Sequence, residues 1–143
     1  DEKDAKAYAG LINVFMKAGQ AEQGKAIFDS LPEDVKIDKA LASVKDTISM
    51  MEDAPSRAEQ DNLRKSISKN QDDYQSRYDL AVSLFAHGEQ DEAVSMMLDL
   101  FAGKRDWEDG KAKKQLLKFF EILGDNNPIT VQGRKKLSII LFS

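Results

Sequence analysis

The acidic pairs of this sequence are its first candidates for chemistry, because paired carboxylates can act as acids and bases or hold cations. Asp72-Asp73 and Asp91-Glu92 are examples of such pairs. Both stand at expected helix starts, where carboxylates complement the helix dipole. Asp72, with Gln75 three residues later, has the spacing of a capping box. The segment 106–110, DWEDG, lacks the spaced carboxylates and the closing glutamate of a calcium loop. These acids therefore predict helix ends and a loop.

Other catalytic and metal-binding patterns do not occur in the sequence. There is no cysteine, which excludes disulfides, thiolate metal sites and thiol chemistry. The single histidine, His87, precedes an expected turn, and one histidine excludes most zinc geometries. Neither a phosphate-binding GxxxxGKS/T motif nor a metalloprotease HExxH motif is found. We therefore expect no enzyme activity, no metal and no cofactor.

The C-terminal segment, residues 129–142, is the strongest candidate for a binding function. On a helical wheel, one set of residues lies within about 120°: Ile129, Gly133, Leu137, Ile140 and Leu141. A second set lies opposite: Val131, Lys135, Ile139 and Phe142. Exposed apolar area usually marks an interface. Our hypothesis is that a docking surface for a partner is formed by Val131, Arg134, Lys135, Lys136, Ile139 and Phe142.

Three interpretations of this second apolar face remain open. The face can dock on a partner protein, as the hypothesis states. It can also belong to an ordinary capping helix that folds onto the preceding helix pair. Alternatively, it can pack on a domain that lies outside this sequence. Composition and spacing alone do not choose among them.

The elements that must position these residues are helices. Glycine and proline are sparse, and apolar residues recur at intervals of three and four. In the first segment one stripe comprises Tyr8, Leu11, Ile12 and Phe15. Gly19 interrupts this pattern, and a second stripe comprises Gly24, Ile27, Phe28 and Leu31. This arrangement predicts a hairpin of two helices.

The hairpin pattern recurs along the chain. Residues 17–31, KAGQAEQGKAIFDSL, align without gaps with residues 86–100, AHGEQDEAVSMMLDL. The turn glycines Gly19 and Gly88 are 69 positions apart, which is two periods of about 34 residues, the tetratricopeptide length. We expect these repeat positions to be structural: Gly19, Gly24, Phe28, Gly88, Ala93, Met97 and Gly124. Small residues are expected where the two helices of a hairpin approach closely.

Two weaker copies complete the series. Between the clear copies, the first helix of a third hairpin is predicted from Ile37, Leu41, Val44, Ile48 and Met51. Pro55 opens its second helix, with Ala58 at the small-residue position. In the last hairpin, Leu116, Phe119, Phe120 and Leu123 precede Gly124, and Asn127-Pro128 opens the final helix. The sequence thus predicts one all-α domain, a short right-handed α-solenoid of tetratricopeptide-like hairpins, with units at about 1–34, 35–70, 72–103 and 108–143.

A family resemblance rests on particular residues. They are RYDLA at 77–81, Gly88, Trp107, Leu116-Leu117, Phe119-Phe120, Gly124, Pro128 and the ending 134–142. Residues 77–142 closely, and 8–34 more loosely, resemble the C-terminal repeats of the YbbN/CnoX thioredoxin-domain co-chaperones, the chaperedoxins. The resemblance implies a thioredoxin-like domain N-terminal to the repeats, which this sequence lacks. It also implies a holdase that protects unfolding clients and passes them to a GroEL-type chaperonin, with the C-terminal helix as the contact.

Charge and hydropathy limit the other partners. Residues 1–103 hold 12 Lys and Arg against 20 Asp and Glu, whereas residues 104–143 hold 9 against 5. No aromatic residues interleave with the lysines of the basic part, so we do not expect nucleic acid as a partner. No apolar run is long enough to span a bilayer, and we expect a soluble, cytoplasmic protein.

Two functions compete with the co-chaperone role that the resemblance implies. One is a scaffold for one specific peptide or subunit, and the other is a regulatory appendage of an enzyme.

Overall fold

The computed structural model describes residues 4–143, and every regular element in this range is helical, which confirms the all-α prediction. Residues 1–3 of the first predicted unit lie outside the described range. The elements are α1 (Ala5–Lys17), α2 (Ala21–Ser30), α3 (Glu33–Lys36), η1 (Lys39–Leu41), α4 (Ala42–Asp53), α5 (Arg57–Lys69), α6 (Tyr74–Ala86), α7 (Gln90–Gly103), η2 (Trp107–Asp109), α8 (Lys111–Leu123) and α9 (Pro128–Phe142).

Local capping defines several helix starts. The carboxylate of Asp4 accepts a hydrogen bond from the backbone N–H of Ala7, and the Asn127 side chain accepts one from Ile129. Asp73, not Asp72, caps α6, because its carboxylate accepts bonds from the N–H and hydroxyl of Ser76. These bonds to the charged form lower the pKa of Asp73. The predicted capping box at Asp72 is therefore wrong by one residue.

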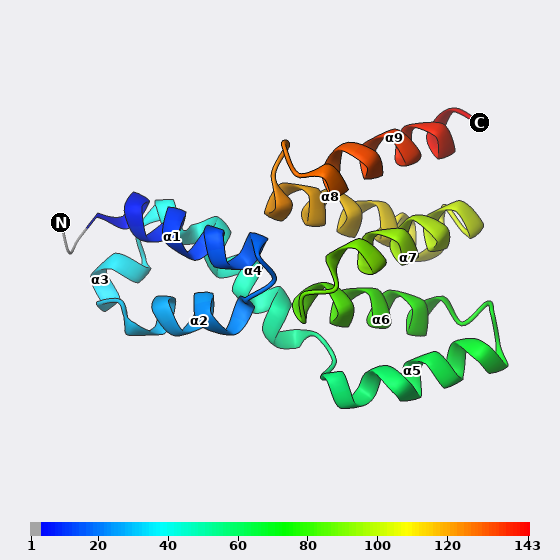
Figure 1. Ribbon diagram of the computed structural model, residues 1–143, viewed down its shortest axis with the longest axis horizontal. Helices are drawn as coiled ribbons and strands as arrows, with labels where there is room; N and C mark the ends of the chain where they lie inside the picture. Colours follow the sequence, from blue (N-terminus) through cyan, green and yellow to red (C-terminus); the bar gives the residue numbers. More distant parts are fainter. Residues whose placement is uncertain (1–3) are drawn as a thin grey trace.

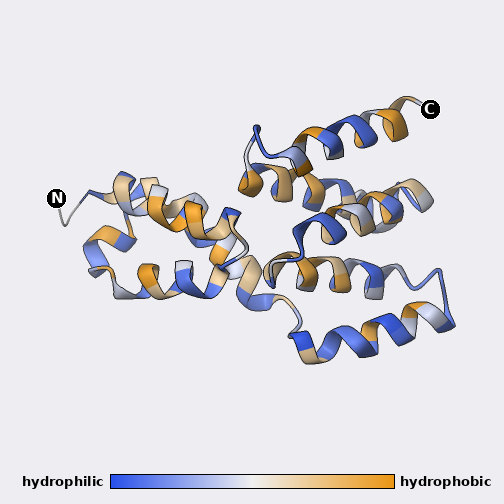
Figure 2. Cartoon of the chain, in the orientation of Figure 1, coloured by the Kyte–Doolittle hydropathy of each residue, from blue (hydrophilic) through white to orange (hydrophobic). Residues whose placement is uncertain are grey.

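The helices form two lobes that meet at the turns of two hairpins (Figure 1). One lobe contains α1 to α4, and the other contains α5 to α9. The α1–α2 and α6–α7 hairpins point their turns toward each other at the centre of the molecule. Apolar residues line the sides of the helices that face their neighbours, whereas polar residues cover most of the outer surface (Figure 2).

The two repeated turn glycines contact each other at this junction. Gly19 and Gly88 both have positive φ, 76° and 90°. A Cβ added to Gly19 would lie 2.6 Å from the Cα of Gly88, so only hydrogen fits between the two turns. Beside this contact, the buried side-chain amide of Gln90 donates to the carbonyl of Met16, which ties α7 to α1. The lobes are thus held together at the positions that define the sequence repeat.

Two small-residue positions lie where the helices of a hairpin approach closely. A Cβ on Gly24 would lie 2.8 Å from the Met16 methyl group, and Ala93 is fully buried. Phe28 packs on the core, and Met97 has no exposed surface. Gly124 ends α8 with a φ of 90°. These residues allow close helix packing or form turns, as the repeat pattern predicts.

The predicted hairpin of residues 35–70 is wrong as a packed pair. Helix α4 packs on α1, α2 and α6, whereas α5 packs on α6, so the two helices belong to different lobes. The connection through Pro55 is extended, with ψ values of 144° at Ala54 and 165° at Ser56. Ala58 is accordingly exposed and mediates no close approach. Ile37 is also exposed, because it lies at the end of α3 rather than in α4.

The buried face of α1 also differs from the predicted stripe. Ile12 is fully buried, but Leu11 is 45% exposed. The face that packs against η1 and α2 instead consists of Ala5, Ala9, Ile12 and Met16. Ala5 and Ala9 are small enough for this face because η1 comes close to the start of α1. Leu11 and Val14 are left on the outer side of this helix.

We expect Gly19→Ala to lower the free energy of unfolding by at least about 2 kcal/mol. A positive φ costs an L-residue about 1–2 kcal/mol, and overlap with Gly88 adds to this loss. Chemical denaturation measures the change. Gly103→Ala is the matched control, since a Cβ there meets nothing within 4 Å and should cause no loss. Equal stability of the two variants would contradict the role of the turn contact.

Candidate interaction surface

Helix α9 is held on the C-terminal lobe by one side only. A Cβ on Gly133 would lie 2.6 Å from the Phe120 ring, so the glycine lets α9 approach α8 closely. Thr130 and Leu137 are buried on the same side. Helix α8 is in turn joined to α6, because the rings of Phe85 and Phe119 stack with centroids 4.0 Å apart. This packing fixes the orientation of the helix and therefore of its opposite face.

The opposite face of α9 exposes the apolar residues that the helical wheel placed there. Ile139 is 69% exposed and Phe142 is 87% exposed, and Val131 is exposed on the same side. Lys135 is exposed between them in the helical register. We call these four residues the α9 outer face. Their exposure agrees with the sequence prediction, and their role in partner binding stays a prediction.

The two other residues of the predicted docking surface lie on the flanks of α9. Arg134 points toward the α8–α9 turn, where its guanidinium lies 2.9 Å from the Asp125 carboxylate and 6.0 Å from the centre of the Phe120 ring. This arginine therefore stabilises the turn. Lys136 lies on the other flank, beside α7. The six predicted residues are thus distributed over three sides of the helix.

Sequence reasoning missed Arg105, which orders the end of α9. The guanidinium of Arg105 donates hydrogen bonds to the carbonyl of Ile140 and to the hydroxyl of Ser143. A cation at a helix C-terminus satisfies free carbonyls and complements the helix dipole. The last turn, which carries Phe142, is therefore anchored to the α7–α8 loop. Only the three-dimensional fold brings these residues together.

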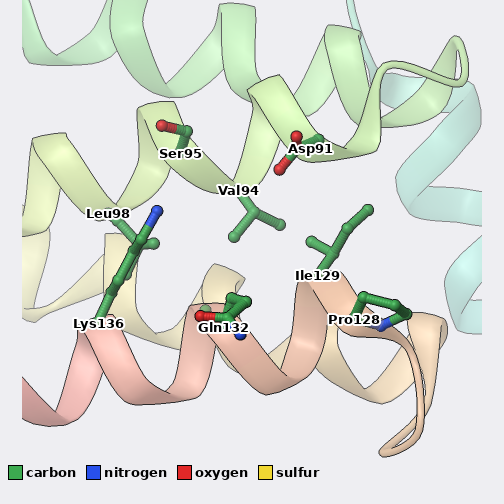
Figure 3. A pocket seen from close by; sticks show the side chains of 9 residues that line it. Asp91, Val94, Ser95, Leu98, Pro128, Ile129, Gln132 and Lys136 are labelled. Atoms are coloured by element: carbon green, nitrogen blue, oxygen red, sulfur yellow. The ribbon is translucent and has the colours of Figure 1, made fainter.

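A groove between α7 and α9 was also missed. Its cavity is about 310 Å³ in volume. Val94 and Leu98 of α7 and Ile129 of α9 project into the space between the helices (Figure 3). Asp91 stands at one end of the groove and Lys136 at the other (Figure 3). The groove thus combines an apolar floor with opposite charges at its two ends.

Trp107 anchors the segment before α8, as its position in the sequence predicts. Its ring lies 5.5 Å from that of Tyr78 on α6, and the ammonium of Lys111 lies 4.5 Å from the centre of the Tyr78 ring. The Tyr78 hydroxyl donates to the amide oxygen of Gln115 on α8. Burial raises the pKa of Tyr78, with a further contribution from Asp79. These contacts join α6, η2 and α8.

Comparison with known proteins identifies the repeat. A family model of the tetratricopeptide repeat matches residues 53–142. The chain belongs to the tetratricopeptide-repeat family. The predicted solenoid of tetratricopeptide-like hairpins is confirmed at this level. Tetratricopeptide repeats bind other proteins on their surfaces, so the chain is a protein–protein interaction domain.

One solved structure shares this tetratricopeptide fold. It is a domain of VP0806, a protein of unknown function from Vibrio parahaemolyticus, with a TM-score of 0.56 and 20% sequence identity. The match covers 93% of this chain and 77% of the other. No curated protein sequence matches the chain. Within residues 4–143, no helix is both long enough and apolar enough to cross a membrane.

We expect Thr130→Val to raise the free energy of unfolding by about 1 kcal/mol. Thr130 is fully buried, and its hydroxyl has no hydrogen-bond partner within the described part of the chain. Valine keeps the shape and removes the unsatisfied group. Thr47→Val is the matched control, because the buried Thr47 hydroxyl donates to the carbonyl of Ser43. Urea denaturation should show a gain for the first variant only, and a loss at Thr130 would contradict the prediction.

Proposed function

We propose that this tetratricopeptide domain serves a holdase-type co-chaperone that binds unfolding clients and docks on a GroEL-type chaperonin. The resemblance to the chaperedoxins suggests this role. The observation that carries it is the exposure of Ile139 and Phe142 on a helix whose other side is tightly packed. An ordered apolar surface of this kind is suited to a partner that removes it from water.

The α9 outer face has the features of a docking site. Covering an apolar side chain of this size gains about 1.5–3 kcal/mol relative to leaving it exposed. Ile139 and Phe142 are three residues apart, so they lie next to each other on the helix surface. The anchoring of the last turn by Arg105 reduces the conformational entropy lost on binding. Lys135 favours a partner surface that combines apolar and acidic groups.

The α7–α9 groove supplies a separate place for client segments. Its floor of Val94, Leu98 and Ile129 accepts apolar side chains of the kind that unfolding proteins expose. Ser95 and Gln132 on its margins offer hydrogen bonds to an extended backbone. Because the groove and the outer face lie on different sides of α9, a client and a chaperonin can be bound together.

The groove also favours an alternative function, recognition of one specific peptide or subunit without a chaperone role. Asp91 and Lys136 place opposite charges at its two ends. A peptide with the complementary charges would bind in one direction only, which is a source of specificity. An aggregation assay separates the two functions, because a holdase protects many clients and a specific scaffold does not.

Docking is tested with a double variant, Ile139→Glu with Phe142→Glu. We expect binding to a purified GroEL-type chaperonin to fall at least about 10-fold, since two buried apolar contacts are replaced by charge. The melting temperature should stay nearly constant, because both side chains are exposed. Deleting residues 138–143 is a poorer test, since it also removes Ile140 and Leu141, which pack on the core.

Leu117→Glu is the control for this experiment. Leu117 is also an exposed apolar residue, but it lies on α8 outside the α9 outer face. This control should bind the chaperonin as the unmodified chain does. Unchanged binding of the double variant would refute docking through α9. A large loss of stability in the double variant would instead support the interpretation of α9 as a simple capping helix.

Client protection is tested with thermally unfolding citrate synthase, followed by light scattering. We expect the chain to suppress aggregation and Ser95→Arg to suppress it less, because the arginine side chain fills the groove. Ser95 is exposed, so the substitution leaves the core intact. The double variant at Ile139 and Phe142 is the matched control and should protect normally. Absence of protection by the unmodified chain would favour the specific scaffold.

A further inference from the structure

The groove between α7 and α9 carries one unpaired charge of each sign. Asp91 stands at the end of the groove where both helices begin, and Lys136 stands at the other end (Figure 3). Both side chains are exposed, and neither has an ion-pair partner within residues 4–143. The next acid of α7 differs in this respect, because Glu92 pairs with Arg64 at 3.0 Å. The charges of Asp91 and Lys136 are therefore available to a ligand.

The floor between these two charges is apolar and fixed in position. Val94 and Leu98 of α7 are buried, and Ile129 of α9 packs against the same core. All three side chains face the space between the helices (Figure 3). The cavity of about 310 Å³ is at the lower end of the range of ligand sites, about 300–1,000 Å³. The groove is thus suited to a short ligand with apolar groups in its middle.

The length of the groove indicates how many residues a peptide ligand would place in it. Asp91 and Leu98 lie at its two ends and are seven positions apart on α7, a rise of about 10 Å. An extended chain advances about 3.3 Å per residue, so about three residues span this distance. A helix is about 10 Å wide with its side chains, and the narrower extended form fits the small cavity better.

We propose that the α7–α9 groove binds an extended segment in which a basic and an acidic residue are separated by three residues, the first and third of them apolar. This inference rests on the proposed use of the groove as a peptide site. Alternate side chains of an extended chain point to the same side, so the two apolar side chains face the floor together. The charged side chains leave from the other side and pair with Asp91 and Lys136 at the rim.

The exposure of the two charges limits the strength of this interaction. Exposed ion pairs contribute little to affinity, and salt screens them. We expect a dissociation constant on the order of 1 mM for a short peptide. In about 1 M sodium chloride the preference for charge should disappear, because the Debye length falls to about 3 Å, whereas the apolar contact should persist.

Titration of the 143-residue chain with short peptides tests the ligand class. The probe is a capped nine-residue peptide with lysine, leucine, serine, leucine and glutamate between glycine-serine flanks. In methyl-labelled protein, we expect the signals of Val94, Leu98 and Ile129 to shift. The signal of Ile139, on the α9 outer face, should not move. A peptide with serine in place of both leucines should cause no shift.

A charge-reversal variant tests the role of the two ends. Lys136→Glu makes both ends of the groove acidic. Relative to the unmodified chain, its preference should move at least about 5-fold from the mixed peptide toward a peptide with lysine at both charged positions. Lys135→Glu is the matched control, because it changes the net charge equally but lies on the α9 outer face. Its preference should equal that of the unmodified chain.

Three results would overturn the proposal. The first is no shift of the groove methyl signals with the mixed peptide at concentrations up to about 5 mM. The second is the same peptide preference in Lys136→Glu and Lys135→Glu. The third is equal binding of the leucine and serine peptides. Chaperonin docking is tested at Ile139 and Phe142, outside the groove, so its failure would leave these three measurements unchanged. Protection of citrate synthase without any peptide binding would contradict this proposal alone.

Discussion

The contact between the turns at Gly19 and Gly88 is the constraint on which the rest of the structure depends. Because the two hairpins meet at their tips, each hairpin extends away from the other into its own lobe. Helix α4 then contacts α1 and α2 in its own lobe and α6 in the other lobe. The chain continues into α5, which covers α6. The C-terminal lobe continues by adding α8 and α9 to α7. A side chain at Gly19 would separate the turns and with them the lobes.

Much of the fold could be predicted from the sequence, because it depends on local signals. Asn127-Pro128 specifies the start of α9, and Gly124 specifies the end of α8, whatever the rest of the chain does. The division between α4 and α5 could not be predicted in this way. Pro55 marks the start of a helix, but an extended connection and a hairpin turn are equally compatible with it. The choice is made by packing on α6, which is distant in the sequence.

The candidate site could likewise be predicted only in part. The exposure of Ile139 and Phe142 follows from helical periodicity and from the burial of Leu137, both of which the sequence contains. Periodicity could not show that Arg134 pairs with Asp125 or that Arg105 holds the last turn. It also failed for Leu11, since the buried side of α1 consists of Ala5, Ala9, Ile12 and Met16 and leaves Leu11 outside. A helical wheel identifies the faces of a helix, but only the contacts with other elements show which face is buried.

The two lobes expose apolar side chains on different helices. Leu11 and Val14 are exposed on α1 in one lobe, and Ile139 and Phe142 are exposed on α9 in the other. Occupation of one of these surfaces therefore leaves the other accessible. Each surface belongs to a helix whose opposite side is packed on the core, so both are fixed in orientation before a partner arrives.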